Sequence, residues 1–278
     1  MKTIRTVKSM RDEARRWHME GRRIGLVPTM GFLHEGHLSL VRIACERADV
    51  TVVSIFVNPT QFGPAEDLER YPRDLERDLE LCRREGVAAV FCPPAGEMYA
   101  ADFSTWVEET SLSKGLCGSS RPGHFRGVTT IVAKLLNCVS PDVAVFGRKD
   151  AQQALVIRRM VRDLDFPVEI VTGPLIREHD GLAMSSRNAN LSARGRAAAR
   201  GMPAALREIR EAFQSGVRDA AELRRTGEAV LTAHGVRPDY VDVLRPDTLE
   251  TADIAKSGDV VAVAGFVEQT RLIDNCDL

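Results

Sequence analysis

Two histidines three residues apart are the side chains whose types and spacing best suit chemistry. His34 and His37 stand near the end of the stretch Pro28–Leu38 (PTMGFLHEGHL). Residues three apart share one face of a helix, so a single helical turn would aim both imidazoles at one place. There they could donate hydrogen bonds to phosphate oxygens as charge builds up during phosphoryl transfer. Zinc binding or chance are the alternatives, although no third ligand stands at metal spacing.

A second group, Met184–Asn188 (MSSRN), offers two hydroxyls and a guanidinium within a few residues. Arginine presents forked donors that match paired phosphate oxygens. Ser185, Ser186 and Arg187 are therefore candidates for clamping phosphates. The alternative is a serine-rich linker ahead of a helix.

The third group is Phe146–Gln153 (FGRKDAQQ), which reads as the end of a strand turning into a helix. Lys149 would then lie beside the same crevice as His37. The alternatives are a solvated lysine and, for Asp150, a helix N-cap.

Alternating short apolar runs and helical patterns from residue 22 to about 172 predict the elements that must position these groups. Strands separated by helices form βαβ units with a parallel sheet, and such sheets bind ligands at the carboxyl ends of their strands. The predicted strands are Ile24–Pro28, Val50–Val57, Val87–Phe91, Val143–Phe146 and Val168–Val171, and the predicted helices are Leu38–Arg47, Asp74–Glu85, Val128–Val139 and Ala151–Leu164.

After Pro174 the pattern changes to a polar loop, two helices and several strands. The loop covers 177–190, and Ser192 is a plausible N-cap for a helix running to about Phe213. A helix over 220–234 and strands over 240–244, 259–266 and 270–273 follow. We therefore predict an α/β fold with a Rossmann-like parallel sheet domain over residues 1–175. A smaller C-terminal α+β domain over 176–278 would act as a lid over the active site.

The composition of the chain excludes several classes of protein. The 278 residues carry 38 Lys+Arg against 39 Asp+Glu, a net charge of −1, which gives no reason to expect nucleic acid or an anionic membrane as partner. Apolar stretches fall short of a membrane span, the N-terminus has no apolar signal region, and we expect a cytoplasmic protein. The six cysteines form no CxxC pair, so we expect reduced thiols rather than a zinc or redox motif. The chain also lacks GxxxxGK(S/T) and, after its first strand, GxGxxG.

Five segments together closely resemble the pantothenate synthetase (pantoate–β-alanine ligase) family. They keep its order and spacing over nearly the whole chain: Pro28–Val41, Phe56–Phe62, Arg121–Gly127, Gly147–Gln153 and Asp180–Asn188. The histidine pair and the Met184–Arg187 segment are also similar to the HIGH and KMSKS elements of class I aminoacyl-tRNA synthetases, within the wider HIGH-motif nucleotidylyltransferase superfamily.

The resemblance implies a two-step ligation of (R)-pantoate and β-alanine. ATP and pantoate give pantoyl adenylate and pyrophosphate, and β-alanine then displaces AMP to give pantothenate. It also implies Mg²⁺ without metal-ligating side chains of the protein, and a homodimer built on the N-terminal domains. The implied catalytic residues are His37, His34, Lys149 and Arg187; the implied substrate-binding residues are Gln61, Gln153 and Asn58; and the implied ATP contacts are Met30, Gly31, Phe32, Leu33, His34, Glu35, Gly36, His37, Gly147, Arg148, Lys149, Asp150, Ile176, Met184, Ser185, Ser186 and Arg187.

Three positions depart from the family pattern, and none is a central catalytic one. Ala151 stands where tyrosine is usual, Arg148 where Glu or Gln is common, and Asn190 where an aromatic is frequent. Two rival functions are a nucleotidyltransferase of the same superfamily and a catalytically inactive nucleotide-binding regulator. Neutral Asn58, Gln61 and Gln153 disfavour a phosphorylated acceptor, and the retained His37 and Lys149 disfavour an inactive protein.

The expected chemistry needs no general base in its first step. A carboxylic acid of pKa near ~4 is ionised at neutral pH, so the task is to hold two anions and stabilise charge on the phosphates. In the second step an amine of pKa near ~10 must lose a proton, which Gln61 cannot remove. The loop over 177–190 is expected to close on ATP and shield the adenylate from water.

Overall fold

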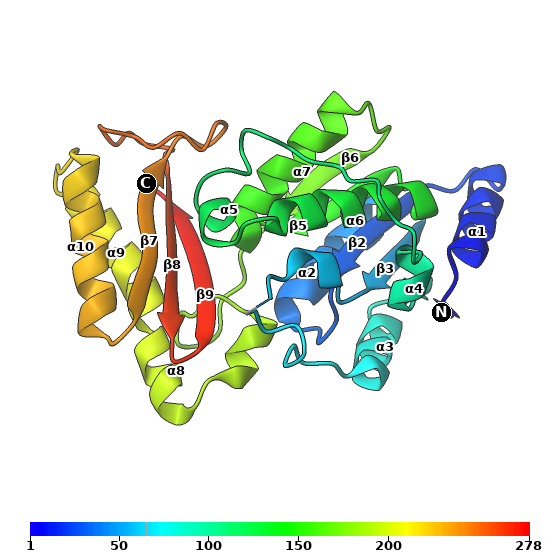
Figure 1. Cartoon of the computed structure of the whole chain (residues 1–278), viewed down its shortest axis with the longest axis horizontal. Helices are drawn as coiled ribbons and strands as arrows, with labels where there is room; N and C mark the ends of the chain where they lie inside the picture. The colour runs from blue at the N-terminus through cyan, green and yellow to red at the C-terminus, as the bar shows by residue number, and fades with distance from the viewer. Residues whose placement is uncertain (65) are drawn as a thin grey trace. The chain divides into compact units, whose positions relative to one another are not determined.

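The structure, a computed structural model, describes residues 1–64 and 66–278, and these form two units (Figure 1). The first comprises Met1–Arg148 and Gln152–Pro174. The second comprises Lys149–Ala151 and Leu175–Leu278. Among the described residues, no helix has the length and apolar character that crossing a bilayer requires.

A parallel sheet of six strands forms the centre of the first unit. Every paired neighbour in it is parallel, which confirms the predicted α/β sheet. The strands lie in the order β1 (Lys2–Ile4), β4 (Ala89–Phe91), β3 (Val50–Ile55), β2 (Ile24–Thr29), β5 (Val143–Gly147) and β6 (Glu169–Gly173). The carboxyl ends of the central pair, β2 and β3, therefore lie side by side.

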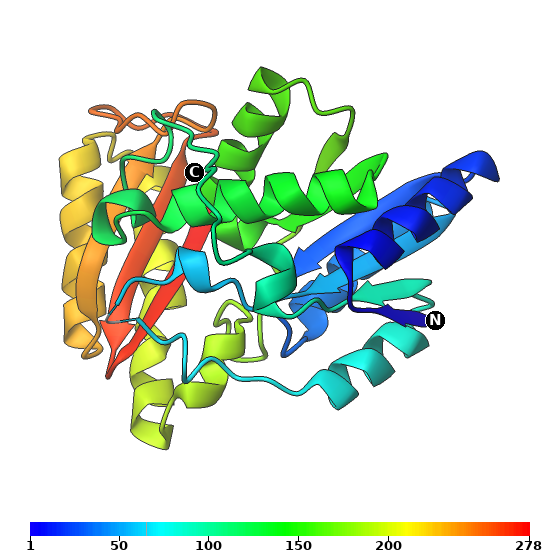
Figure 2. The same cartoon turned by 45° about the vertical axis from the view of Figure 1, so that its right-hand side comes forward.

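Helices cover both faces of this sheet, and Figure 2 shows the strands between α1 and α3. On one face, α2 and α3 pack against Val27, Val53 and Val90. On the other, α1 and α6 contact each other and β2. The helices of this part of the chain are α1 (Val7–Met19), α2 (Glu35–Arg47), α3 (Leu75–Arg84), α4 (Ala95–Met98), α5 (Cys117–Ser120), α6 (His124–Val139) and α7 (Ala151–Asp163), with 3-10 turns η1 (Pro59–Gln61) and η2 (Arg148–Asp150).

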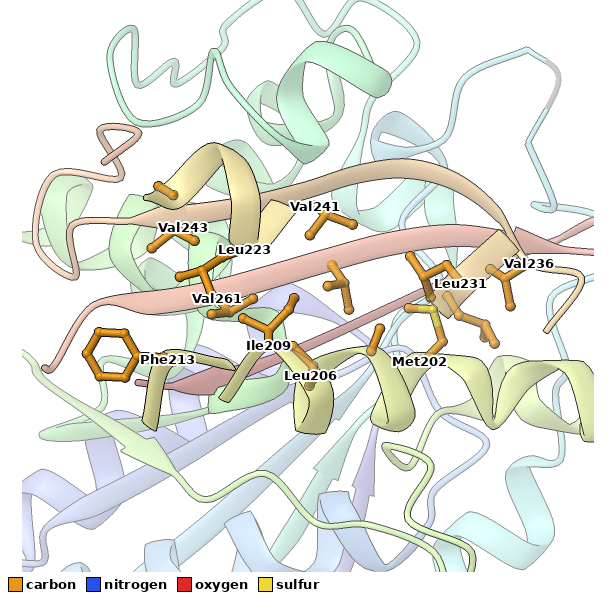
Figure 3. Packing of buried hydrophobic residues seen from close by; sticks show 14 of the residues in the cluster. Met202, Leu206, Ile209, Phe213, Leu223, Leu231, Val236, Val241, Val243 and Val261 are labelled. Carbon is orange, nitrogen blue, oxygen red and sulfur yellow. The ribbon is translucent and has the colours of Figure 1, made fainter. Parts of the chain in front are cut away.

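The second unit is an α+β unit with an antiparallel sheet of three strands, as predicted. Its sheet order is β7 (Arg237–Leu244), β8 (Val260–Val267) and β9 (Thr270–Asp277). The helices are α8 (Ala193–Ala199), α9 (Gly201–Gln214) and α10 (Ala220–Ala233), with a 3-10 turn η3 (Ser186–Asn190). Figure 3 shows the core, where Ile209 of α9 and Leu223 of α10 pack on Val241 and Val261 of the sheet.

Four details of the sequence prediction need correction. The helix predicted from Ser192 to about Phe213 is two helices that meet at Arg200, although Ser192 does cap the first by accepting from the Gly195 amide. Pro203 explains the break, because its ring clashes with a helical carbonyl four residues earlier. The segment predicted as a loop over 177–190 ends in η3. The strand β1 was not predicted, and α2 begins at Glu35 rather than Leu38.

Candidate active site

The histidine pair lies at the N-terminus of α2, directly beyond the carboxyl end of β2. His34 is the N-cap residue and His37 is the third residue of the helix. The backbone nitrogen of His34 lies 3.3 Å from Nδ1 of His37, and the ring centroids are 4.0 Å apart. The structure therefore brings both imidazoles together at a helix end where the dipole favours negative charge.

A strained turn delivers these histidines. Gly31 and Phe32 both adopt left-handed backbone angles, with φ of 84° and 51°, and such a φ is uncommon for a residue with a side chain. The turn is tied to the sheet because the Gly31 amide donates to Thr29 Oγ1, which itself donates to the Ser54 carbonyl. Hydrogen bonds that link the turn to β2 and β3 thus hold a conformation that the chain would otherwise avoid.

Asp78 of α3 anchors the same turn. Its two carboxylate oxygens accept from the amides of Phe32 and Leu33, each at 2.7 Å. Arg77, the preceding residue, donates to the Leu33 carbonyl at 3.0 Å. Burial raises the pKa of the Asp78 carboxyl, while its two backbone hydrogen bonds act in the opposite direction. The amides of Phe32 and Leu33, both predicted ATP contacts, are thus engaged by the protein's own carboxylate.

Sequence reasoning missed Asp78, although a signal was available. It stands between Leu75, Leu79 and Cys82 on the apolar face of α3, and it is 1% exposed. A buried acid at such a position requires partners, because an unpaired charge is costly to bury. An acid within a core stripe therefore indicates a backbone or cationic partner elsewhere.

Two of the predicted substrate-binding amides lie together after β3. Asn58 caps η1 and Gln61 ends it, with Nδ2 of Asn58 3.1 Å from Oε1 of Gln61. The same Nδ2 donates to the carbonyl of Gly127 on α6. A Cβ on Gly127 would lie 2.4 Å from the Thr60 carbonyl oxygen, so only glycine permits this approach.

The Arg121–Gly127 motif supports Gln61 through its backbone. Arg121 donates through Nη2 to the Gln61 carbonyl at 3.2 Å, and His124 Nδ1 lies 2.9 Å from the same oxygen. Arg121 also forms an ion pair with Glu66 at 2.5 Å. Burial opposes ionisation of Glu66, but Arg121, with His124 and the Gly63 backbone, more than offsets it and lowers the pKa of that carboxyl. The motif is thus a support for the turn that carries Gln61.

The adjacent glutamines of α7 have different surroundings. Gln152 is buried and its amide bonds the carbonyls of Leu112 and Gly115 and the amide of Cys117. Gln153, the predicted substrate ligand, is half-buried. Gly147 ends β5 and Arg148 follows it in the same unit.

Lys149 and Asp150 belong to the second unit. The Lys149 carbonyl accepts from Nδ2 of Asn275 on β9 at 3.0 Å, and its ammonium lies 3.9 Å from the Asp150 carboxylate. The neighbouring Asp274 pairs with Arg177 through both oxygens, at 2.7 and 3.0 Å. Burial raises the pKa of the Asp274 carboxyl, and Arg177 opposes that shift. The end of β9 thus holds both Lys149 and the start of the segment over 177–190.

Hydrogen bonds within Met184–Asn188, and from Asn188 to a charged side chain, hold this segment. Ser185 Oγ accepts from the Arg187 amide at 3.3 Å. Asn188, which follows, donates to Glu178, and Arg196 of α8 binds Glu178 at 2.8 Å. Burial opposes ionisation of Glu178, but Arg196 and Asn188 more than offset it and lower the pKa of that carboxyl. Nearby, the carbonyl of Ile176 accepts from the Met184 amide.

The family model and two of the most similar sequences name one family. The family described as pantoate-beta-alanine ligase matches residues 2–277. A pantothenate synthetase of Moorella thermoacetica is 52% identical over 99% of this chain and 98% of its own length. One from Thermotoga petrophila is 52% identical over 99% of both chains.

Two solved structures that cover the whole chain belong to the same family. The pantothenate synthetase of Thermus thermophilus has a TM-score of 0.94 and 47% identity, covering 100% of this chain and 99% of its own. A pantoate-beta-alanine ligase of Francisella tularensis, solved as a complex with beta-gamma ATP and beta-alanine, has a TM-score of 0.82 and 31% identity, covering 100% and 97%.

Proposed function

The chain belongs to the pantoate–β-alanine ligase family, and on that premise we propose that it joins (R)-pantoate to β-alanine at the expense of ATP. The products are pantothenate, AMP and pyrophosphate, and the intermediate is pantoyl adenylate. The observation that carries the proposal is the pair of imidazoles, with centroids 4.0 Å apart, at the N-terminus of α2 in a chain that matches the family over residues 2–277.

In the first step a carboxylate oxygen of pantoate attacks the α-phosphorus of ATP, and the bond to pyrophosphate breaks. The carboxylate is already ionised at neutral pH, so no base is required. His37, with His34 beside it, donates hydrogen bonds to the oxygens on which negative charge increases. The helix terminus adds a fixed positive end to the same place.

The second unit contributes the remaining charge in this proposal. Lys149 and Arg187 stabilise the phosphates, and Ser185 and Ser186 orient them. The unit acts as a lid that excludes water from the adenylate. These assignments rest on the family resemblance. The bonds from the Arg187 amide to Ser185 Oγ and from Asn188 to Glu178 support them, because a segment that is already ordered loses little freedom on binding.

Pantoate binds between Gln61 and Gln153, with the β-alanine site adjoining Gln61. In the second step the amine nitrogen attacks the acyl carbon, the bond from that carbon to the phosphate oxygen breaks, and AMP leaves. The amine enters deprotonated or passes its proton to phosphate or water. Neutral amides suit a substrate with hydroxyl and carboxylate groups, since an amide both donates and accepts.

Magnesium, dimerisation and location complete the proposal. Magnesium enters as part of the nucleotide substrate, because it binds preferentially through phosphate oxygens and water. The enzyme works as a homodimer built on its N-terminal units, in the cytoplasm. Sedimentation of the purified protein measures the dimer directly, and a single species of 30.7 kDa would argue against it.

Isotope exchange tests the mechanism. With pantoate present and β-alanine omitted, labelled pyrophosphate is expected to enter ATP. Exchange that required β-alanine would exclude a free adenylate. Product analysis separates the rivals, because a nucleotidyltransferase yields a dinucleotide and a binding protein yields no AMP on addition of pantoate.

A further inference from the structure

The side-chain amide of Asn58 has one allowed orientation. It is 1% exposed, and its Nδ2 lies 3.1 Å from the Gly127 carbonyl while its Oδ1 lies 3.4 Å from the Thr60 backbone nitrogen. Backbone groups cannot exchange donor and acceptor roles. Rotating the amide by 180° would place Nδ2 against the Thr60 N–H, two donors, and Oδ1 against the Gly127 carbonyl, two acceptors. Leaving such groups unpaired in a buried place is costly.

Two hydroxyl groups complete the hydrogen bonding of the Asn58 oxygen. The Tyr99 hydroxyl and the Thr60 hydroxyl each lie 2.9 Å from Oδ1 of Asn58. The oxygen thus receives protons from three sides, and the nitrogen of Asn58 keeps one hydrogen beyond the bond to Gly127. Asn58 is saturated within the protein.

The remaining hydrogen of Asn58 fixes the amide of Gln61. Nδ2 of Asn58 lies 3.1 Å from Oε1 of Gln61, so that oxygen must be the acceptor. The Nε2 group of Gln61 consequently lies on the opposite side of the amide from Asn58, 3.2 Å from the sulfur of Met30. Thioether sulfur is a weak acceptor, so this NH₂ retains its capacity for a stronger one.

We infer that Asn58 is a positioning residue that makes Gln61 a hydrogen-bond donor toward the substrate. The backbone of α6 and η1 fixes the orientation of the Asn58 amide, and the Asn58 amide in turn fixes the orientation of the Gln61 amide. The group that Gln61 recognises is an acceptor oxygen, and the acceptor of greatest strength in the proposed substrates is an ionised carboxylate. This inference rests on the proposed function, which sets pantoate beside Gln61.

Two replacements of Gln61 test whether its amide donates a hydrogen bond to the substrate. Gln61→Glu keeps the shape but removes the donor and sets a carboxylate against a carboxylate, whereas Gln61→Ala only removes the amide. We expect the KM for pantoate to rise at least as much in Gln61→Glu as in Gln61→Ala, with the KM for ATP changed by less than about threefold in both. A Gln61→Glu enzyme with nearly normal pantoate KM would overturn the inference.

A double-mutant cycle tests the relay from Asn58. If Asn58 acts through Gln61, the variant Asn58→Ala/Gln61→Ala raises the pantoate KM no further than Gln61→Ala alone. Multiplying effects would mean that Asn58 binds substrate independently and would overturn the relay. The exposed Asn137 of α6 supplies the control, because Asn137→Ala removes an amide of the same unit away from the site.

The unmodified chain is assayed first for pantoate-dependent pyrophosphate release. Absence of turnover would overturn the proposed function and this inference with it. If the enzyme turns over and the effects of Asn58→Ala and Gln61→Ala on the pantoate KM multiply, the inference is overturned while the proposed function stands. Thermal unfolding of each variant separates misfolding from a change in pantoate KM, and the Gln61 pair gives a result even when Asn58→Ala fails to fold.

Discussion

The carboxylate of Asp78 lies 2.7 Å from the backbone nitrogen of Leu33, the residue immediately before the histidine pair. It also accepts from the Phe32 amide, where the backbone is left-handed. A side chain from α3 therefore holds the turn that aims His34 and His37. The position of the imidazoles depends on a helix that contributes no predicted contact to the nucleotide.

Asp78→Asn should lower adenylation while leaving a folded protein. The amide keeps one acceptor but sets its NH₂ against one of the two backbone donors, a loss of about 1–3 kcal/mol. We expect at least a tenfold fall in pantoate-dependent pyrophosphate release and a lower melting temperature. Glu80→Gln, on the same helix and paired with the exposed Arg83 and Arg84, is the control. An unchanged rate in Asp78→Asn would mean that the turn holds its shape without the carboxylate.

His37→Ala and Lys149→Ala should each remove most of the adenylation rate. Loss of a donor to charge that develops in the transition state costs about 10²–10³ in kcat. Pyrophosphate release in a single turnover measures this step, and circular dichroism confirms folding. Near-normal release from both variants would contradict the roles assigned to them.

Much of the fold could be predicted because the decisive signals are local. The β-branched run at Val50–Ile55 is a buried strand, and Ser192 is a cap, as their residue types indicate. The strand Lys2–Ile4 could not be predicted, since it is short and exists through its pairing with Ala89–Phe91. Pro203 was a local signal for the break between α8 and α9 that the apolar pattern concealed.

The site was predictable in part for the same reason. His34 and His37 meet because they are the N-cap and the third residue of one helix, a relationship that lies within four residues of the sequence. Asp78 reaches the turn before them from 45 and 46 residues along the chain, and no spacing rule indicates such a contact. The orientation of Gln61 likewise depends on a carbonyl of α6. Contacts between residues far apart in the sequence could be found only in the structure.

Removing Arg177 from the Arg177–Asp274 pair should lower the free energy of unfolding more than removing the charge of Asp274. The Asp274 side chain is 0% exposed and that of Arg177 is 33% exposed. Arg177→Gln leaves a buried charge without its partner, which costs about 3–5 kcal/mol at neutral pH. Asp274→Asn should cost less than half as much, because Arg177 reaches solvent and keeps the carbonyls of Gly181 and Asn275. Urea unfolding measures both, and equal losses would contradict the asymmetry.

The loss in Arg177→Gln should also depend on pH. Burial raises the pKa of the Asp274 carboxyl above 3.8, with Arg177 and Lys149 opposing the shift. Without Arg177 the folded-state pKa rises further, so folding disfavours the ionised form and stability falls as pH increases through that value. The free-energy difference from the unmodified protein is therefore expected to be smaller at pH 5 than at pH 7.5. A constant difference would show that Asp274 keeps its charge state.

Gly127→Ala should disrupt the turn that carries Asn58 and Gln61. An added Cβ would lie 2.4 Å from the Thr60 carbonyl oxygen and 2.7 Å from the Gln61 backbone nitrogen. Both are backbone atoms, so η1 and α6 must separate, and overpacking of this kind costs about 1–3 kcal/mol. Separation also breaks the bond from Asn58 to the Gly127 carbonyl, so the KM for pantoate should rise together with the loss of melting temperature. Gly96→Ala is the matched control, because a Cβ there meets nothing within 4 Å. A Gly127→Ala enzyme that loses stability but keeps its pantoate KM would show that the amides hold their orientation without contact to α6.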